Sequence, residues 1–435
     1  MMSQGVRRRR VPGEAGSPPA YSVILDPGTT TLRLLSAELA PGQATVWGWA
    51  QGPMPPPGTG DPQQLLPLLE ELLNKAEWAA ESKVGQRVVG GQLVVGLPAS
   101  QLRGWSWSVS QQRSQPVRPV DERELGALLG RASRLAISRL QDGAGAAAAQ
   151  DSSTARDPSR GSGWVAVDQV CVFLSVDDHG VTDPVGFAAE RMGAMVFAAL
   201  ASVATIEAWR TIASRLGFST LLLAATPVAQ VSGLSDPEGL LIDVGGATTD
   251  LVLWRAARPV ALQSVPVGGE SLTAPLIQAW GLSPARAREL KGTYASGQLP
   301  KEAKSQILQA ILPGLRAWFD EVEQGLSRFC ELGPLPHRLF LSGGGSVLPE
   351  MAEAARALVW SEQLAFTRYP EITRLQPTSI PHVLNRTDEG REAGDVTALA
   401  LAAWAAEQVK PLGRPARVLN EMCEAERFIS GRFLA

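Results

Sequence analysis

The residues of this chain best suited to chemistry lie in a polar bend between two apolar runs. The stretch 240–254 reads Leu-Leu-Ile-Asp-Val-Gly-Gly-Ala-Thr-Thr-Asp-Leu-Val-Leu-Trp, and its apolar ends predict two buried strands joined by a tight turn. Glycines let backbone N–H groups approach a phosphate closely, and threonine hydroxyls add further donors. The carboxylates would repel a phosphate unless a hydrated Mg²⁺ lay between them. The polar residues concerned are Asp243, Gly245, Gly246, Thr248, Thr249 and Asp250.

An ordinary Gly-Gly hairpin would explain one such bend equally well, but the chain repeats the pattern near its start. The stretch 24–35 reads Ile-Leu-Asp-Pro-Gly-Thr-Thr-Thr-Leu-Arg-Leu-Leu, with the same order of apolar strand, aspartate, glycine, threonines and apolar strand. A duplicated phosphate-binding hairpin implies two similar domains that hold one nucleotide from both sides. In this first bend the candidate residues are Asp26, Gly28, Thr29 and Thr30.

A third stretch, 339–346, is an apolar strand that runs into a glycine turn, Leu-Phe-Leu-Ser-Gly-Gly-Gly-Ser. Such a turn can lie flat against a base or a ribose, because Gly343, Gly344 and Gly345 carry no side chains. In their order and spacing, the three stretches resemble the two phosphate loops and the adenosine loop of the actin, Hsp70 and sugar-kinase ATPase superfamily.

This resemblance implies both a fold and a set of ligands. The fold would be α/β, with two actin-like (ribonuclease H-like) lobes around a nucleotide cleft and a small α+β insertion subdomain. The ligands would be ATP and Mg²⁺, with Asp26 and Asp243 on the metal side.

Composition excludes several other classes of protein. The chain has 435 residues, enough for two or more domains, and its net charge of −3 gives no basic field that would favour nucleic acid. Its three cysteines and three histidines are scattered without the spacing of a metal site or a disulfide framework, which indicates a reducing cytosol. We find no apolar run of about 18 residues, so membrane contact is expected to be peripheral.

Composition and pattern divide the chain into successive segments. Residues 1–20 carry four consecutive arginines among Pro, Gly and Ser, which is typical of a disordered tail, and residues 142–163 have too little apolar surface to fold. The predicted segments are domain I, first part (21–100), the inserted subdomain (101–186, with a disordered loop at 142–163), domain I, second part (187–235), domain II (236–375, with a subdomain at about 270–335), a return to domain I (376–412), and a C-terminal linker and amphipathic helix (413–435).

A short motif at the end of the inserted segment points to particular families within this superfamily. Residues 183–186 read Asp-Pro-Val-Gly, similar to the D-P-x-G element that leads out of the insertion in FtsA, the bacterial cell-division actin homologue. PilM, the pilus-assembly relative, shares the insertion and ranks second because no comparable D-P-x-G element is known in it. The FtsA resemblance implies a polymerising protein that tethers an FtsZ-like tubulin homologue to the inner face of the cytoplasmic membrane. The PilM resemblance implies an adaptor whose insertion binds a peptide from a membrane partner.

Two further elements match both of these families. Residues 267–273 resemble their G-G-x-x-[IL]-T turn through Gly268 and Gly269, and 287–291 resembles their Ala-Glu-x-[IL]-Lys helix. The resemblance places Lys291 near the adenine, although a solvated helical lysine would look the same. Arg288 stands where these families have a glutamate near the ribose.

The last segment could meet a membrane surface. Its apolar residues recur every three or four positions, as on one side of a helix, and its charges balance to zero, so it lacks the basic excess typical of lipid-binding helices. FtsA carries a membrane-binding helix here; the alternative is a helix that docks onto the protein or a partner. The apolar residues are Val418, Met422, Ala425, Ile429 and Phe433.

Turnover of ATP needs a group that positions or deprotonates water. Several members of the superfamily have a Glu before a Pro ahead of the second phosphate loop, and the matching position here is Thr226. A threonine is a poor base, so hydrolysis is expected to be slow or absent, with ATP acting as a brace between the lobes. A small-molecule kinase is a further alternative; the acids that it would need, Asp178 and Asp183, fall in the insertion.

Overall fold

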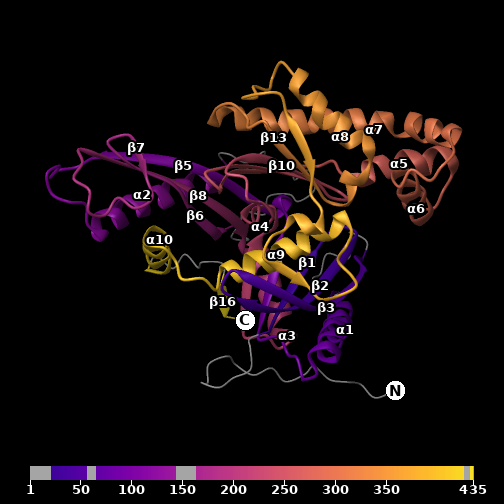
Figure 1. Cartoon of the computed structure of the whole chain (residues 1–435), viewed down its shortest axis with the longest axis horizontal. Coiled ribbons are helices and arrows are strands. Elements are labelled where there is room, and N and C mark those ends of the chain that lie inside the picture. Colours follow the sequence, from indigo (N-terminus) through magenta and orange to yellow (C-terminus); the bar gives the residue numbers. More distant parts are fainter. Residues whose placement is uncertain (1–20, 56–64, 144–162, 426–431, 435) are drawn as a thin grey trace.

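The computed structural model describes residues 21–55, 65–143, 163–425 and 432–434. The tail 1–20 and nearly all of the loop 142–163, both predicted to be disordered, lie outside the described residues. The described strands form two sheets, of seven and nine strands (Figure 1).

The seven-stranded sheet is the core of the first lobe. Its β1–β2 and β2–β3 pairs are antiparallel, whereas β4 runs parallel to β1 and β9 parallel to β4. This mixed order explains why the first bend, between β1 and β2, lies at the same edge as the carboxyl ends of β4 and β9. In spatial order the strands are β15 (Val383–Asn385), β3 (Gln43–Pro53), β2 (Thr31–Ala40), β1 (Tyr21–Pro27), β4 (Gln92–Leu97), β9 (Thr220–Ala225) and β16 (Arg432–Leu434).

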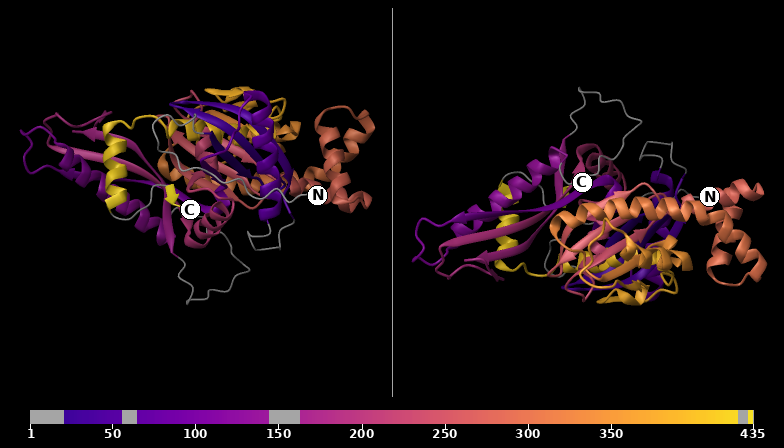
Figure 2. Two further views of the ribbon diagram at one scale, coloured as in Figure 1. Left: turned by 90° about the horizontal axis from the view of Figure 1, so that it is seen from below. Right: turned by 90° about the horizontal axis from the view of Figure 1, so that it is seen from above.

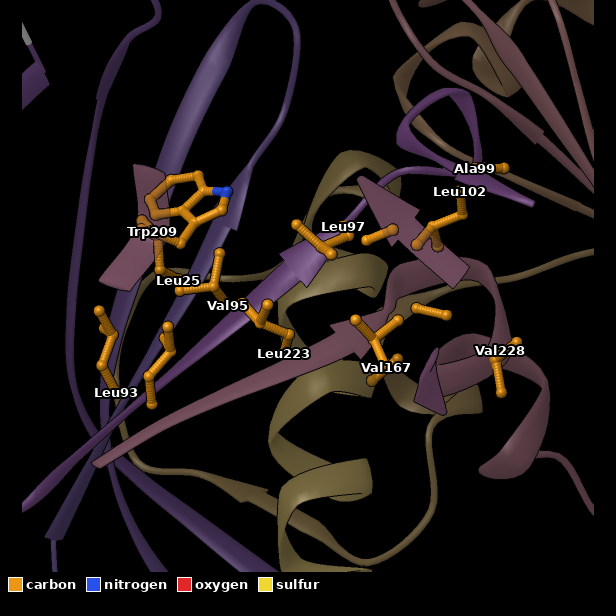
Figure 3. Packing of buried hydrophobic residues seen from close by; sticks show 14 of the residues in the cluster. Leu25, Leu93, Val95, Leu97, Ala99, Leu102, Val167, Trp209, Leu223 and Val228 are labelled. Atoms are coloured by element: carbon orange, nitrogen blue, oxygen red, sulfur yellow. The ribbon is translucent and has the colours of Figure 1, made fainter. Parts of the chain in front are cut away.

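Helices cover both faces of this sheet, so its central strands are apolar on both sides. Leu25 packs with the helices of one face, and Ile24, its neighbour in β1, packs with the α9 helix on the other, as strand alternation requires. Figure 3 shows the first of these cores, where Leu25, Val95 and Leu223 meet Trp209. The helices are α1 (Leu66–Val84) and α3 (Val203–Arg215) on one face and α9 (Val396–Glu407) on the other.

The nine-stranded sheet begins in the second lobe. The β10–β11 hairpin carries the second bend, and β13 lies parallel to β10, so that the glycine turn after β13 reaches the same edge. The strands of this lobe are β14 (Glu371–Arg374), β13 (Arg338–Ser342), β10 (Gly239–Val244), β11 (Thr249–Arg255) and β12 (Arg258–Val265). Its helices are α5 (Gly269–Trp280), α6 (Pro284–Ala295), α7 (Lys301–Ser327) and α8 (Pro349–Ala357).

The inserted segment continues this second sheet. Strand β5 pairs with β12 through Trp105 and Gly104 only, and the sheet then runs on through β8, β6 and β7 away from both lobes (Figures 1 and 2). Strand β8 belongs to this sheet as far as Ser202, beyond residue 186 where the sequence pattern ended the insertion. Its elements are β5 (Leu102–Gln112), α2 (Glu122–Gln141), β6 (Trp164–Val176), β7 (His179–Val181) and β8 (Arg191–Ser202).

The C-terminal segment corrects one prediction, because it does not form a single amphipathic helix. It forms a helix, α10 (Arg414–Ala425), followed after the masked residues by strand β16, which pairs with β9 and contains Phe433. Ile429 lies outside the described residues.

Helix α10 packs against α2 and crosses the inserted segment (Figures 1 and 2). Val418 and Leu419 are buried there, and Gly130 leaves room for Met422, whose Cε would lie 2.6 Å from a Cβ atom at that position. Arg417 and Arg414 pair with Glu122 at 2.5 and 3.3 Å. The described part of α10 therefore follows the docking alternative, while localisation at a membrane stays a prediction. Among the described helices, none is long and apolar enough to span a bilayer.

Candidate nucleotide site between two polar bends

The first bend ends β1 and begins β2. Asp26 is the last acidic residue of β1, is 5% exposed and lies opposite Arg33 in the antiparallel register. A Cβ atom at Gly28 would lie 2.8 Å from the carbonyl oxygen of Thr31, so the tight bend requires glycine there. Thr29 and Thr30 are exposed at its tip.

The second bend is built in the same way from β10 and β11. The N–H of Gly245 donates to the carbonyl oxygen of Thr248 at 2.9 Å, which closes the turn. Asp243 precedes this turn in the position that Asp26 has in the first bend.

The two bends meet. The N–H groups of Gly246 and Ala247 both donate to Thr29 Oγ1, at 3.2 and 3.3 Å. Two successive N–H groups that converge on one oxygen form the arrangement that binds an anion. The lobes therefore face each other through their bends, and the site fits a phosphate oxygen.

Glycines from two other turns border the bends. The N–H of Gly269 donates to the Gly245 carbonyl oxygen at 2.8 Å, and a Cβ atom at Gly268 would lie 2.6 Å from the Gly246 oxygen. Gly343 has φ +81° and a Cβ there would lie 2.4 Å from Asp243 Oδ1. The turns after β12 and β13 can approach the second bend only because these residues have no side chains.

The remaining glycines of the turn after β13 differ from one another. A Cβ atom at Gly345 would lie 2.5 Å from Val244 Cγ1, so this glycine is needed for packing against β10. At Gly344 a Cβ would meet nothing within 4 Å, which leaves an open surface of the kind that a base or ribose could cover.

Asp26 is buried and Asp243 is partly buried, with its Oδ1 shielded from solvent, and this changes their acidity. Burial raises the pKa of Asp26 to about 7; Arg33 lowers it, and the nearby Asp243 and Asp395 raise it. Burial raises the pKa of Asp243 to about 6, against the lowering effects of the Gln230 amide, the Ser342 hydroxyl and the charge of Arg33. The influence of Asp243 on Asp26 agrees with the contact between the bends and places both carboxyls at one site.

The donor set fits a cation that arrives with a phosphate ligand. Within the described chain, Asp243 Oδ1 is buried and has no hydrogen-bond partner, as expected of an oxygen that faces a metal-bound water. No group of three or more His, Cys, Asp and Glu side chains in that part of the chain could hold a metal alone. Mg²⁺ commonly binds through one or two carboxylates together with substrate phosphates, which these bends could supply.

Other predicted residues have structural partners. Thr249 Oγ1 donates to the Val267 carbonyl oxygen at 2.7 Å and is fully buried, and Thr248 is half-buried beside the bend. Lys291 Nζ donates to the Gly269 carbonyl oxygen at 2.6 Å and to Thr273 Oγ1 at 2.7 Å, so it braces the turn after β12.

Asp250 holds the lobe rather than a ligand. Its carboxylate accepts from the N–H of Ala99 at 2.8 Å and from the hydroxyl of Ser264 at 2.6 Å, which joins the second bend to the chain entering the insertion. Burial also raises the pKa of Asp250 to about 7.

The sequence pattern missed two side chains that contact the site carboxyls. Arg33 lies 3.5 Å from Asp26 and 2.7 Å from Asp395, and Gln230 Nε2 donates to Asp243 Oδ2 at 2.7 Å. The only signal for Arg33 was its place in the second strand of the bend. Gln230 had a weaker signal, one helical turn after Thr226.

Comparisons with known proteins give a fold and no family. No family model matches the chain, and no curated protein matches it. Among solved structures it is similar to a chain of the PilM-PilN type IV pilus biogenesis complex, at 20% identity and a TM-score of 0.58, over 91% of this chain and 100% of that one. The fold is actin-like. A second similar structure is the ethanolamine utilization protein EutJ from Carboxydothermus hydrogenoformans, at 15% identity and a TM-score of 0.47, over 89% and 91% of the two chains.

The actin-like fold confirms the predicted fold class, an α/β protein with two actin-like lobes. The identity is too low to show more than the fold. The narrower resemblance to FtsA stays a prediction, and the PilM-like second choice agrees with the structural similarity.

Proposed function

We propose that this protein binds Mg-ATP between its two lobes and serves as an actin-like assembly adaptor of the PilM kind. The observation that carries the proposal is the contact of the two bends, where N–H groups of Gly246 and Ala247 converge on Thr29 Oγ1. A phosphate chain held there would touch both lobes, so binding would favour the closed arrangement.

The chain's own residues suggest how a nucleotide would be held. The N–H groups of the second bend and the threonine hydroxyls of the first would donate to the phosphates, and the turn Gly343 to Gly345 would border the adenosine. Mg²⁺ bound with the triphosphate would offset its charge beside the carboxyls.

Slow or absent hydrolysis belongs to the same proposal. Thr226 is buried at the start of α4 (Thr226–Ser232), and its Oγ1 would lie 2.5 Å from a Cβ atom at Gly96. Its hydroxyl thus packs on β4 and offers no carboxylate base. Of the acids considered for a kinase, Asp178 pairs with Arg191 and Asp183 with Arg414, both in the inserted segment.

The inserted segment supports the adaptor role. At the end of its sheet, the β5–α2 and β7–β8 loops are joined by hydrogen bonds, and they expose Val117 (90%) and Phe187 (50%). Exposed apolar side chains grouped on one feature are typical of a partner site. The partner would be a peptide of a membrane component, as the resemblance to PilM implies, and the similar structure is that of a PilM-PilN complex.

The FtsA kind is the second candidate, favoured by the Asp-Pro-Val-Gly element at 183–186. In that case the partner would be an FtsZ-like tubulin homologue, with self-assembly and a place on the inner face of the membrane.

Binding of two peptides separates these candidates. Fluorescence anisotropy would be measured with a cytoplasmic peptide of a PilN-like component and with an FtsZ tail peptide, each with Mg-ATP present. We expect binding of the first and its loss in a Val117→Asp, Phe187→Asp double variant that still binds mant-ATP. Binding of the FtsZ peptide alone would favour the second candidate, and absence of mant-ATP binding by the folded protein would refute the nucleotide proposal.

A further inference from the structure

Each bend carboxyl is connected to the start of α9 through one long side chain. In the first bend this side chain is a cation: Arg33 lies 3.5 Å from Asp26 and 2.7 Å from Asp395. The charge of Asp26 is thus countered by the protein. A metal ion near Asp26 would also be repelled by the neighbouring guanidinium.

In the second bend the connecting side chain is a neutral amide. Gln230 is fully buried in α4, and its Nε2 donates to Asp243 Oδ2 at 2.7 Å and to Thr397 Oγ1 at 3.0 Å. The nitrogen must face Asp243, because a carboxylate oxygen only accepts hydrogen bonds. Both N–H groups of the amide are therefore used, and its orientation is fixed at two ends.

This arrangement leaves one oxygen of Asp243 for a ligand. Oδ2 is taken by Gln230, whereas Oδ1 is buried against Gly343 and accepts no hydrogen bond of normal geometry from a described residue. The Ser342 hydroxyl lies near enough to lower the pKa of Asp243, but its Oγ is itself without a partner of normal geometry among the described residues. Gln230 Oε1 is likewise buried and unpartnered there. Buried oxygens usually have a hydrogen-bond partner, so Oδ1 is the oxygen of Asp243 that a ligand could still satisfy.

Within the described chain, Asp243 has no cation in direct contact, although the charge of Arg33 reaches it from a distance and lowers its pKa. Among the described residues it has no ion-pair partner, whereas Asp26 has Arg33. The two carboxyls of the repeated motif therefore differ in how much negative charge they can offer to a metal.

We propose that Gln230 is a positioning residue that aims Oδ1 of Asp243 at the hydrated Mg²⁺ of a bound nucleotide, and that Asp243 rather than Asp26 is the principal metal-side carboxylate. The inference rests on the proposed nucleotide site. It goes beyond that site because it assigns unequal roles to the two bends and adds α4 and α9 to the support of the metal.

The test is the Mg²⁺ dependence of mant-ATP binding at pH 8, where both carboxyls are ionised. Gln230→Met keeps the length of the side chain and removes its hydrogen bonds. We expect the Mg²⁺ concentration at half-effect to rise about 10-fold or more, as for other side chains that orient a metal ligand. Binding in EDTA should stay within about 2-fold of the original, since Gln230 acts through the metal side alone.

Matched variants and a second readout complete the experiment. Asp243→Asn should remove most of the Mg²⁺ dependence of mant-ATP binding, and Asp26→Asn should change that dependence far less. Electron paramagnetic resonance of Mn²⁺ bound with ADP should likewise show a larger loss of Mn²⁺ binding in Asp243→Asn than in Asp26→Asn. Thr397→Val removes one hydrogen bond of Gln230 and leaves Asp243 unchanged. It should raise the required Mg²⁺ concentration, as Gln230→Met does, by a smaller factor. It replaces Gln230→Met if that variant does not fold.

Two outcomes would overturn the inference while leaving the proposed function intact. One is an unchanged Mg²⁺ requirement in Gln230→Met and Thr397→Val. The other is an equal effect of Asp26→Asn and Asp243→Asn. A wild-type protein that binds mant-ATP in neither Mg²⁺ nor EDTA would instead refute the nucleotide site itself, and the inference with it.

Discussion

The two polar bends have nearly the same sequence pattern and different surroundings. Asp26 is joined to Arg33, a cation whose other partner is Asp395, whereas Asp243 is joined to Gln230, a neutral amide. The motif alone predicts equal roles for the two aspartates. The side chains that contact the two aspartates make their roles unequal. A repeated motif therefore predicts the backbone geometry of a site, whereas its electrostatics depend on residues outside the motif.

The largest expected loss of stability comes from a substitution in the first bend. Arg33→Met leaves Asp26 and Asp395 buried without their cation, which typically costs about 3–5 kcal/mol. Urea unfolding at pH 7.5 measures this loss. Gln230→Met, which removes neutral donors, should cost about 1–3 kcal/mol in the same assay. Equal losses in the two variants would contradict the difference between the bends.

The pH dependence of stability tests the buried carboxyls in both bends. Their folded pKa values, about 7 for Asp26 and about 6 for Asp243, lie above the ordinary 3.8, so the folded state binds protons more readily. The free energy of unfolding without ligand should therefore fall as pH rises from about 4 to 7, by up to about 1.4 kcal/mol per pH unit for each titrating carboxyl.

The two carboxyls should separate in this assay. Asp243→Asn should remove a part of the slope that ends near pH 6, and Asp26→Asn a part that continues to about pH 7. Urea unfolding between pH 4 and 8 measures both parts of the slope. A wild-type curve that is flat or rises over this range would show that these carboxyls are not buried as described.

Substitutions of two neighbouring glycines test how closely the turn after β13 approaches the second bend. Gly343→Ala places a Cβ against Asp243 Oδ1 in a left-handed conformation, and we expect a loss of about 1–3 kcal/mol with weakened mant-ATP binding. Gly344→Ala, in open space, is the control and should stay within about 0.5 kcal/mol. Thermal unfolding compares the two, and similar melting temperatures would argue against the close approach of this turn to Asp243.

The smallest effect lies away from both bends. Arg417→Glu opposes Glu122 across the α10–α2 contact, and because the pair is exposed we expect a loss below about 1 kcal/mol. Mant-ATP affinity should not change. A large change in affinity would mean that the C-terminal helix acts on the nucleotide site, which the bends alone would not explain.

Much of the fold followed from local sequence, and the supports of the site did not. The apolar runs around Asp26 and Asp243 predicted both hairpins, because strand periodicity is a local property. Arg33 and Asp395 are 362 residues apart, and Gln230 and Thr397 are 167 apart, so only the folded chain shows that they meet.

The prediction of a single amphipathic helix at the C-terminus was wrong for a related reason. Helical spacing showed that Val418 and Met422 share a side, but it could not show which surface receives that side. The receiving surface depends on Gly126 and Gly130, which open α2 to close contact, and those residues lie far away in the sequence. An apolar side of a helix predicts burial, and the partner has to come from the tertiary structure.

The central claim is that both bends share one nucleotide. Isothermal titration calorimetry of the folded, full-length protein with ATP at millimolar Mg²⁺ tests it most directly, because it reports stoichiometry as well as affinity. The account predicts one ATP for each chain and loss of that binding when either Gly28 or Gly246 is changed to valine. Two ATP for each chain, or no heat with either ATP or ADP, would contradict it.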